Sequence, residues 1–235
     1  MPETAAKQIP QPGGVNQTDA ASVQAGDVVR HLTHELRQPL STIESIAFYL
    51  RMVLPEESKA APQLEKLHDL VEQINWVLSD AVHLLQAAPV NRQVADLREL
   101  IVRALADRPS TAAEPLQLEF QDEPVLVSLD ASQALHLIRG VVLVLRQMVR
   151  GGSKIIVRAR VERQEVNLEF LVPALDMQQG ELDRLFEPFA SGLASGPGLS
   201  LATARRIAES HGGRMNARSE VGRGTLLRGA FPLAG

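Results

Sequence analysis

The sequence contains no cysteine. It therefore has no disulfide, no thiol nucleophile and no cysteine-ligated metal, as is common for proteins of a reducing compartment. No run of about 18 apolar residues is present, so we expect no membrane span. Residues 1–17 also lack the apolar segment of a secretory signal. We therefore expect a soluble, cytoplasmic protein that does not bind membranes.

Aromatic side chains are scarce, with 6 Phe, 1 Trp and 1 Tyr in 235 residues. Stacking platforms for single-stranded nucleic acid are therefore not expected. The 24 Lys and Arg residues are outnumbered by 28 Asp and Glu, which gives a net charge of −4 and no bulk attraction to nucleic acid. The hydrophobic share of 45% and the charged share of 22% are typical of a globular chain of one or two domains.

The N-terminal part of the chain predicts two long helices. Residues 1–19 carry prolines and glycines among polar residues, so we expect a disordered lead. Thr18 or Asp19 is a plausible N-cap for a helix over residues 20–54, in which apolar residues recur every three or four positions. A second pattern of the same kind covers residues 62–85. Two amphipathic helices joined by a short loop form a hairpin.

This hairpin, residues 20–88, cannot cover its own apolar stripes. Its first helix, at roughly 34 residues, would be ~50 Å long. A second copy of the hairpin is the most economical cover for both stripes. We therefore expect a homodimer built around a four-helix bundle.

From residue 91 to residue 235 the pattern changes to alternating helices and strands. Helices are expected at 96–106, 131–149 and 195–210, and strands at 116–120, 125–129, 154–161, 165–172, 214–219 and 225–231. Gly212 and Gly213 provide a left-handed cap for the last helix. This order predicts an α/β sandwich with helices on one face of the sheet. The fold class is therefore α+β, a helical hairpin followed by a sandwich.

His34 is the residue best placed for chemistry on the first helix. It lies about 200° from Leu36 around an ideal helix and so faces away from the apolar stripe. Glu35 is adjacent, and Gln38 follows one turn later. An imidazole with a reference pKa near 6.5 can be a neutral nucleophile at pH 7, and a carboxylate can orient the ring or accept its proton. Pro39 removes a backbone hydrogen bond and should bend the helix at this point.

Two plainer interpretations of His34 stay open from the residues alone. It can be a solvated surface histidine, or it can bind a metal together with His31. The order H-x-x-H-E matches neither H-E-x-x-H nor H-x-x-E-H, and no third ligand is evident. We therefore expect no metal bound by these residues.

The segment HLTHELRQPLSTI, at residues 31–43, resembles the phospho-acceptor box of sensor histidine kinases. Three later segments resemble, in order, the rear half of that family's ATP-binding domain: LFEPF at 185–189, GPGLSLATARRIAESHGG at 196–213 and SEVGRGT at 219–225. The resemblance covers about residues 20–234. It implies that residues 20–88 are the dimerisation and phospho-acceptor hairpin and residues 91–235 a histidine-kinase ATPase domain.

By this resemblance, His34 is the phosphorylated residue and Glu35 its assisting base. Gln38 stands where many members of the family use Thr or Asn to position a hydrolytic water. Phosphohistidine then passes its phosphoryl group to an aspartate of a response-regulator receiver domain, which is the implied partner. Only about twenty residues precede the hairpin, so we expect no sensor domain and an input from a separate sensor or kinase.

The nucleotide motifs of the family are degenerate in this chain. Members carry asparagines on the helix after the third strand, one of which binds Mg²⁺. Here Gly140 and Val144 take those places, and residues 131–149 include no Asn, Asp or Glu. The family's adenine-binding Asp aligns with Val172 without a gap, and with Asp176 when a gap is allowed.

The second glycine box of the family survives in part. Gly196 and Gly198 remain and could hold a phosphate weakly at a helix N-terminus, while Ser200 replaces a common glycine. Losing one charge-assisted hydrogen bond costs about 1.5–3 kcal/mol, and losing the metal ligand removes charge neutralisation. We therefore expect weak or no ATP binding, with Asp176 as a weak adenine ligand.

Three functions follow from these observations. The first is a two-component protein that is phosphorylated on His34 and exchanges phosphoryl with a receiver aspartate, as a phosphotransferase or phosphatase. The second is an active ATP-dependent protein-histidine kinase, which would use ATP and Mg²⁺. The third is a non-enzymatic dimeric regulator that binds a receiver domain or a true kinase.

Overall fold

A computed structural model describes the backbone of residues 17–55, 58–85, 89–106, 116–149, 153–190 and 198–234, and side chains from residue 29 onward. Most of the expected disordered lead, residues 1–16, lies outside the described residues. Within these ranges, no helix is both long enough and apolar enough to span a membrane.

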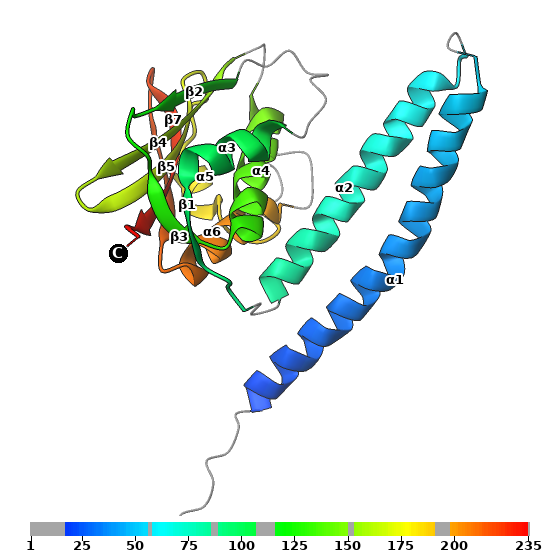
Figure 1. Ribbon diagram of the computed structural model, residues 1–235, viewed down its shortest axis with the longest axis horizontal. Coiled ribbons are helices and arrows are strands. Elements are labelled where there is room, and N and C mark those ends of the chain that lie inside the picture. Colours follow the sequence, from blue (N-terminus) through cyan, green and yellow to red (C-terminus); the bar gives the residue numbers. More distant parts are fainter. Residues whose placement is uncertain are drawn as a thin grey trace, which may run out of the picture.

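The N-terminal part is a hairpin of two long helices, α1 (Gln17–Val53) and α2 (Ala61–Leu85), which run side by side (Figure 1). The helix begins before Thr18 and Asp19, so the expected N-cap is wrong. The two helices meet along a narrow line, because every seventh residue of α1 is buried against α2. These residues are Thr33, Leu40 and Ala47.

The rest of the chain is built on a five-stranded sheet. Its strands, in spatial order, are β2 (Leu116–Phe120), β4 (Ile155–Glu162), β5 (Glu165–Val172), β7 (Gly224–Pro232) and β6 (Arg214–Glu220). β2 runs parallel to β4, and the other neighbours are antiparallel. Arg163 and Gln164 both have positive φ, at 50° and 65°, as a tight hairpin turn between β4 and β5 requires.

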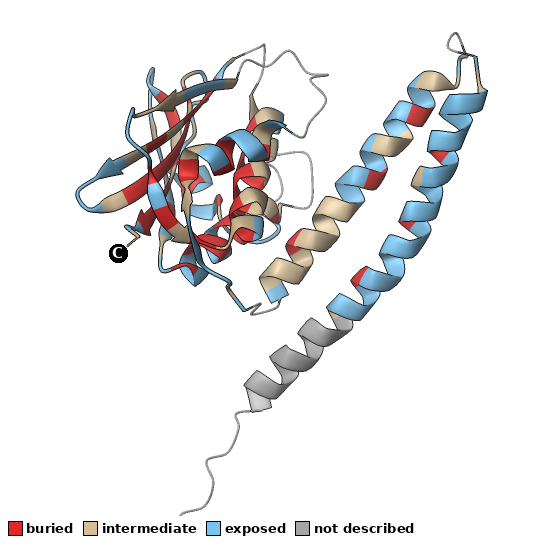
Figure 2. Cartoon of the chain, viewed as in Figure 1, coloured by how far each residue is buried: buried red, intermediate tan, exposed pale blue. Residues whose placement is uncertain are grey.

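Helices cover one face of this sheet, as the sequence predicts (Figure 1). They are α4 (Ala131–Met148) and α6 (Ser200–Ser210), with α3 (Leu97–Ala106) packed on α4. The core between helices and sheet includes Ile138, Phe170, Ile207 and Phe231, each no more than 3% exposed. Figure 2 shows this buried layer, in contrast to the largely exposed α1.

Two short elements were not expected from the sequence. α5 (Gln179–Arg184) begins with a capping box in which the backbone N–H of Gln178 donates to the Glu181 carboxylate. β1 (Gln93–Asp96) pairs with β3 (Leu126–Leu129) in a separate two-stranded sheet. α6 is also shorter than expected, since it begins at residue 200 rather than 195.

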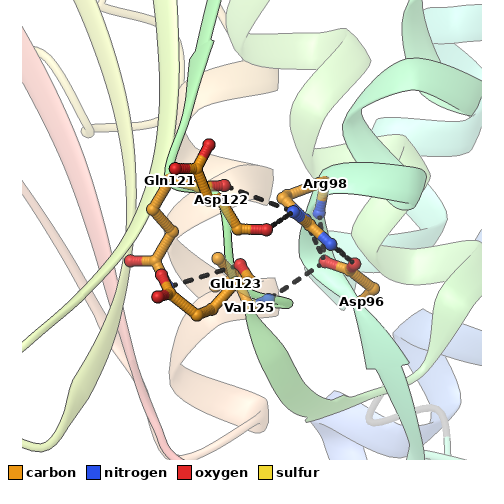
Figure 3. A network of polar contacts seen from close by, with 6 residues as sticks. All are labelled: Asp96, Arg98, Gln121, Asp122, Glu123 and Val125. Carbon is orange, nitrogen blue, oxygen red and sulfur yellow. Dashed lines mark hydrogen bonds and ion pairs between the residues drawn. The ribbon is translucent and has the colours of Figure 1, made fainter.

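An ion pair holds β1 at the start of α3 (Figure 3). Arg98 Nη2 donates to Asp96 Oδ2 over 2.7 Å, and Arg98 Nη1 donates to the Asp122 carbonyl oxygen over 2.8 Å. The Val125 backbone N–H donates to Asp96 Oδ1 over 3.2 Å. Hydrogen bonds from the Arg98 side chain lower the pKa of Asp96. This small network links the end of β1 to the loop before β3.

Candidate functional site

The segment that resembles a phospho-acceptor box, residues 31–43, lies on the described part of α1, where His34, Glu35 and Gln38 are all exposed. The exposure of His34 is consistent with the expectation that it faces away from the periodic apolar residues of this helix. Arg37, one turn from His34, points to α2 and donates from Nη2 to Ser79 Oγ over 2.8 Å. His34 is therefore accessible to another molecule on a helix that is tied to α2 nearby.

Pro39 lies inside α1, and the helix continues through it to Val53. A proline nitrogen carries no hydrogen, so it cannot donate to the carbonyl oxygen of Glu35 one turn earlier. Three residues later, Thr42 Oγ1 donates to the Gln38 carbonyl oxygen over 3.1 Å. The backbone beside His34 is therefore held in part by a side chain.

Large apolar side chains remain exposed along the hairpin, in two groups. The first, called the apolar stripe here, consists of residues of both helices: Leu32, Leu36, Ile43, Ile46, Leu50 and Val53 of α1, and Leu70 and Ile74 of α2. The second lies within about 60° of His34 around α1 and consists of Phe48, Tyr49 and Met52, which are 64%, 63% and 71% exposed. A single chain covers neither group.

We call the C-terminal part, the described residues from 89 onward, the ATPase-like part after the resemblance given above. The second candidate site is its face between α4 and α6, which contacts α2 (Figure 1). Asp80 of α2 is only 1% exposed there. Its Oδ2 accepts a hydrogen bond from Ser200 Oγ over 2.6 Å, and its Oδ1 lies 2.8 Å from His136 Nε2. Trp76 Nε1 donates to the same Ser200 Oγ over 3.0 Å. One buried carboxylate therefore joins three helices.

Aromatic rings stack around this carboxylate. The rings of Trp76 and His136 are nearly parallel, with centroids 4.3 Å apart and an angle of 10° between planes. The centroid of the His83 ring is 4.6 Å from that of His136, and the two rings are tilted by 41°. Burial, and then the neighbouring His136, lower the pKa of His83. We define Trp76, Asp80, His83, His136 and Ser200 as the α2 anchor.

Gly140 lies under the Trp76 ring. A Cβ added to Gly140 would be 3.3 Å from the Trp76 Cζ2 atom and 3.5 Å from the Ser200 Cβ atom. A larger residue would displace the indole ring. At the position where the family resemblance expects an asparagine, the space for a side chain is therefore filled by Trp76 of α2.

The remaining residues that the resemblance assigns to nucleotide binding are Val172 or Asp176 for the adenine and Gly196 and Gly198 for a phosphate. Val172 is 0% exposed and belongs to the apolar core, so it presents no hydrogen-bond acceptor to an adenine. Asp176 is exposed beyond the end of β5. Gly198 has a φ of +68°, and its carbonyl oxygen accepts from the Phe189 N–H over 3.2 Å. Gly196 lies outside the described residues.

A metal site is not evident in the ranges given above. No group of three or more His, Asp or Glu side chains there could hold a metal ion. The described α4 has no Asn, Asp or Glu to offer as a ligand. The residues present therefore do not fit the Mg²⁺ and adenine contacts that the family resemblance implies.

Sequence reasoning missed the α2 anchor. Trp76 and Asp80 lie outside the apolar seam of α2, and the pattern of one helix does not reveal what that outer side contacts. The residues that complete the anchor are 56 and 120 positions away from Asp80 along the chain. Two signals were available. Trp76 is the single tryptophan of the chain, and Gly140 lies in the middle of a predicted helix, where glycine is unfavourable.

Comparison with known families identifies the C-terminal part. Residues 131–235 match the family described as histidine kinase-, DNA gyrase B-, and HSP90-like ATPase. The chain is 26% identical over 217 residues to sensor histidine kinase ZraS of Klebsiella oxytoca, which covers 91% of this chain and 47% of that protein. It is 28% identical over 222 residues to the sensory histidine kinase/phosphatase NtrB of Escherichia coli O157:H7, covering 86% and 61%.

Solved structures show the same fold. Full-length ShkA in complex with AMPPNP superposes with a TM-score of 0.70 at 18% identity, covering 89% of this chain and 46% of that one. The histidine kinase ThkA in complex with the response regulator protein TrrA gives a TM-score of 0.60 at 14% identity, covering 93% and 64%.

The family match covers residues 131–235, and the solved structures share the fold of the chain. Over most of its length the chain is similar to proteins named sensor histidine kinases, at 26% to 28% identity. It spans about half the length of the ZraS proteins that it matches.

Proposed function

We propose that this chain is phosphorylated on His34 and exchanges the phosphoryl group with an aspartate of a response-regulator receiver domain. It does so as a phosphotransferase and phosphatase with weak or no ATP binding. The single observation that carries the proposal is the state of the nucleotide positions. Val172 is buried in the apolar core, and Gly140 and Ser200 contact Trp76 of α2.

The transfer step requires an accessible imidazole, and His34 is exposed on α1. A ring nitrogen attacks the phosphorus of an aspartyl phosphate on the receiver. The bond between phosphorus and the aspartyl oxygen breaks, and the aspartate leaves as a carboxylate with that electron pair. Glu35, the next residue, accepts or orients the proton on the other ring nitrogen, which favours the developing positive charge. The reverse reaction returns the phosphoryl group to the receiver.

The hydrolytic step assigns a role to Gln38, which is exposed one turn after His34. Its side-chain amide positions a water molecule, whose oxygen attacks the aspartyl phosphate to give aspartate and inorganic phosphate. The relative NtrB carries the name histidine kinase/phosphatase, which supports including this activity.

Two surfaces of the hairpin are assigned to partners. The apolar stripe would pack against the same stripe of a second chain, because one hairpin leaves Ile46 and Leu36 about half exposed. Phe48 and Met52, exposed on the same side of α1 as His34, would contact the receiver domain. The structure of ThkA with the response regulator TrrA supports a receiver as the partner class.

The experiment uses the full chain and a panel of receiver domains charged with labelled acetyl phosphate. We expect label to pass from one receiver to the wild type and not to His34→Ala. Gln38→Ala should accept label at the wild-type rate and release inorganic phosphate from the receiver about ten- to a hundredfold more slowly. Ser45→Ala, at an exposed position two turns further along α1, is the matched control. Equal labelling of His34→Ala would contradict the proposal.

An active ATP-dependent histidine kinase is the second candidate. The match of residues 131–235 to an ATPase family favours it, and it would use ATP and Mg²⁺, with Asp176 as the adenine ligand. This kinase would acquire label on His34 from γ-labelled ATP alone. A dimeric regulator with no enzymatic activity would acquire label neither from γ-labelled ATP nor from a charged receiver domain.

A further inference from the structure

The contact between α2 and the ATPase-like part has the features of a permanent interface. Asp80 is 1% exposed, and both of its carboxylate oxygens have partners from the other side, Ser200 and His136. Thr203 Oγ1 adds a hydrogen bond to the Asp80 carbonyl oxygen over 3.4 Å. A buried carboxylate is costly once its partners are withdrawn. Separation of the two parts would therefore need water to replace every one of these contacts.

The sequence of the ATPase-like face is adapted to this contact. Gly140 leaves room for the Trp76 ring, and a Cβ there would be only 3.3 Å from that ring. Ser200 supplies one hydroxyl that accepts from Trp76 and donates to Asp80. These are two of the positions at which the family resemblance expects an asparagine and a glycine for nucleotide binding. Both departures therefore have a structural role in the interface.

We propose that α2, through the α2 anchor, takes the place of the nucleotide on the face between α4 and α6. The ATPase-like part is then a fixed extension of the hairpin rather than a domain that moves to deliver phosphate. The group that occupies the face between α4 and α6 is a segment of this same chain, Trp76–His83. The inference does not depend on the direction of phosphate flow, because it concerns only which group fills this face.

A fixed arrangement has a consequence for any partner of the hairpin. In Figure 1, α1 lies on the far side of α2 from the ATPase-like part. A partner that binds α1 would therefore meet a hairpin whose other side is always occupied. The interface also predicts that adding nucleotide leaves the arrangement unchanged.

The experiment is a distance measurement between spin labels on the full chain. Because the chain has no cysteine, labels can be placed only where cysteines are introduced, at Asp69 of α2 and Arg206 of α6. Both positions are exposed and outside the anchor. Labelled protein is diluted with unlabelled protein, so that distances within one chain dominate. Each sample is measured with and without Mg²⁺-ATP.

The variants restore the residues that the family resemblance expects. Gly140→Asn pushes on the Trp76 ring, and Ser200→Gly removes the hydroxyl shared by Trp76 and Asp80. Gly180→Asn is the matched control for the first, since a Cβ there meets nothing within 4 Å. Ser210→Gly, at the other end of α6, is the control for the second. Circular dichroism shows which variants are folded, and emission of the single tryptophan reports on its surroundings.

We expect one narrow distance in the parent protein, unchanged by Mg²⁺-ATP. Ser200→Gly and Gly140→Asn should lose the narrow distance and shift the tryptophan emission to longer wavelength, while both controls keep the parent values. Ser200→Gly decides the matter if Gly140→Asn does not fold. A broad distance in the parent, a shift of the parent distance on adding Mg²⁺-ATP, or a narrow distance in folded Ser200→Gly would each overturn the proposal.

Discussion

Trp76 of α2 stacks on His136 of α4, with ring centroids 4.3 Å apart, although 60 positions separate the two residues in the sequence. The indole N–H of Trp76 is bound to Ser200 of α6. One tryptophan of α2 therefore contacts both α4 and α6. The hairpin and the ATPase-like part are joined by specific side-chain contacts as well as by the chain connection.

Replacing Asp80 with alanine should lower the free energy of unfolding by about 2–4 kcal/mol, because the Ser200 hydroxyl and the His136 ring lose their buried partner. Urea unfolding followed by circular dichroism measures this change. Asp69→Ala, on the exposed part of the same helix, should change the value by less than about 0.5 kcal/mol. Equal effects for the two variants would show that Asp80 is not a structural centre.

Gly224 should tolerate no side chain. Its φ is +88°, and an added Cβ would lie 2.1 Å from the Val172 carbonyl oxygen. We expect Gly224→Ala to lose more than about 3 kcal/mol of stability, since the strained backbone and the clash add together. Gly180→Ala, in open space on α5, should leave stability unchanged or raise it by up to about 1 kcal/mol. Thermal unfolding of the two variants tests the contrast.

His211 should make the protein less stable in mild acid. Its Nε2 accepts from the Asp130 N–H over 3.0 Å, and its Nδ1 lies 2.7 Å from the Ile207 carbonyl oxygen, which together fit a neutral ring. Burial lowers the pKa of His211 in the folded protein. The unfolded chain, with a pKa near 6.5, then binds the proton first. The free energy of unfolding is therefore highest above pH 6.5 and falls as the pH decreases below that value.

The His211→Gln variant tests this expectation, because glutamine can donate and accept at the same two positions without titrating. The variant should show a weaker loss of stability between about pH 7.5 and about pH 5.5, a range that spans the unfolded pKa. Some loss should remain, since burial also lowers the pKa of His83.

Ile46→Asp should convert a dimer to a monomer. Ile46 is 55% exposed on the apolar stripe, where a charge would be buried against a second hairpin. Light scattering at micromolar concentration should give the mass of two chains for the wild type and one chain for the variant. Ser45→Asp, the adjacent exposed residue, is the control and should remain dimeric. A monomeric wild type would contradict the proposed bundle.

Periodicity predicted the larger elements of the fold because each buries one long apolar face. The patterns at residues 62–85, 131–149 and 165–172 correspond closely to α2, α4 and β5. β1 and α5 were missed because four and six residues are too few to show a period. Their positions are held by local polar contacts instead, such as the Asp96–Arg98 pair.

For the candidate sites, the sequence motif located His34 and its exposure on α1, because a helix fixes which side of itself a residue occupies. It located the departures at Gly140 and Ser200 but gave no reason for them. That reason is a contact with Trp76, whose partners come from two other helices. A pattern along one helix carries no information on such a contact.

Incubation of the purified chain with γ-labelled ATP and Mg²⁺, beside His34→Ala, tests the central claim most directly. A receiver domain charged with labelled acetyl phosphate serves as the second donor in parallel. The account predicts no label from ATP on either protein, and acid-labile, alkali-stable label from the receiver on the wild type alone. Acid-labile label from ATP on the wild type, absent from His34→Ala, would contradict the account and establish an ATP-dependent histidine kinase.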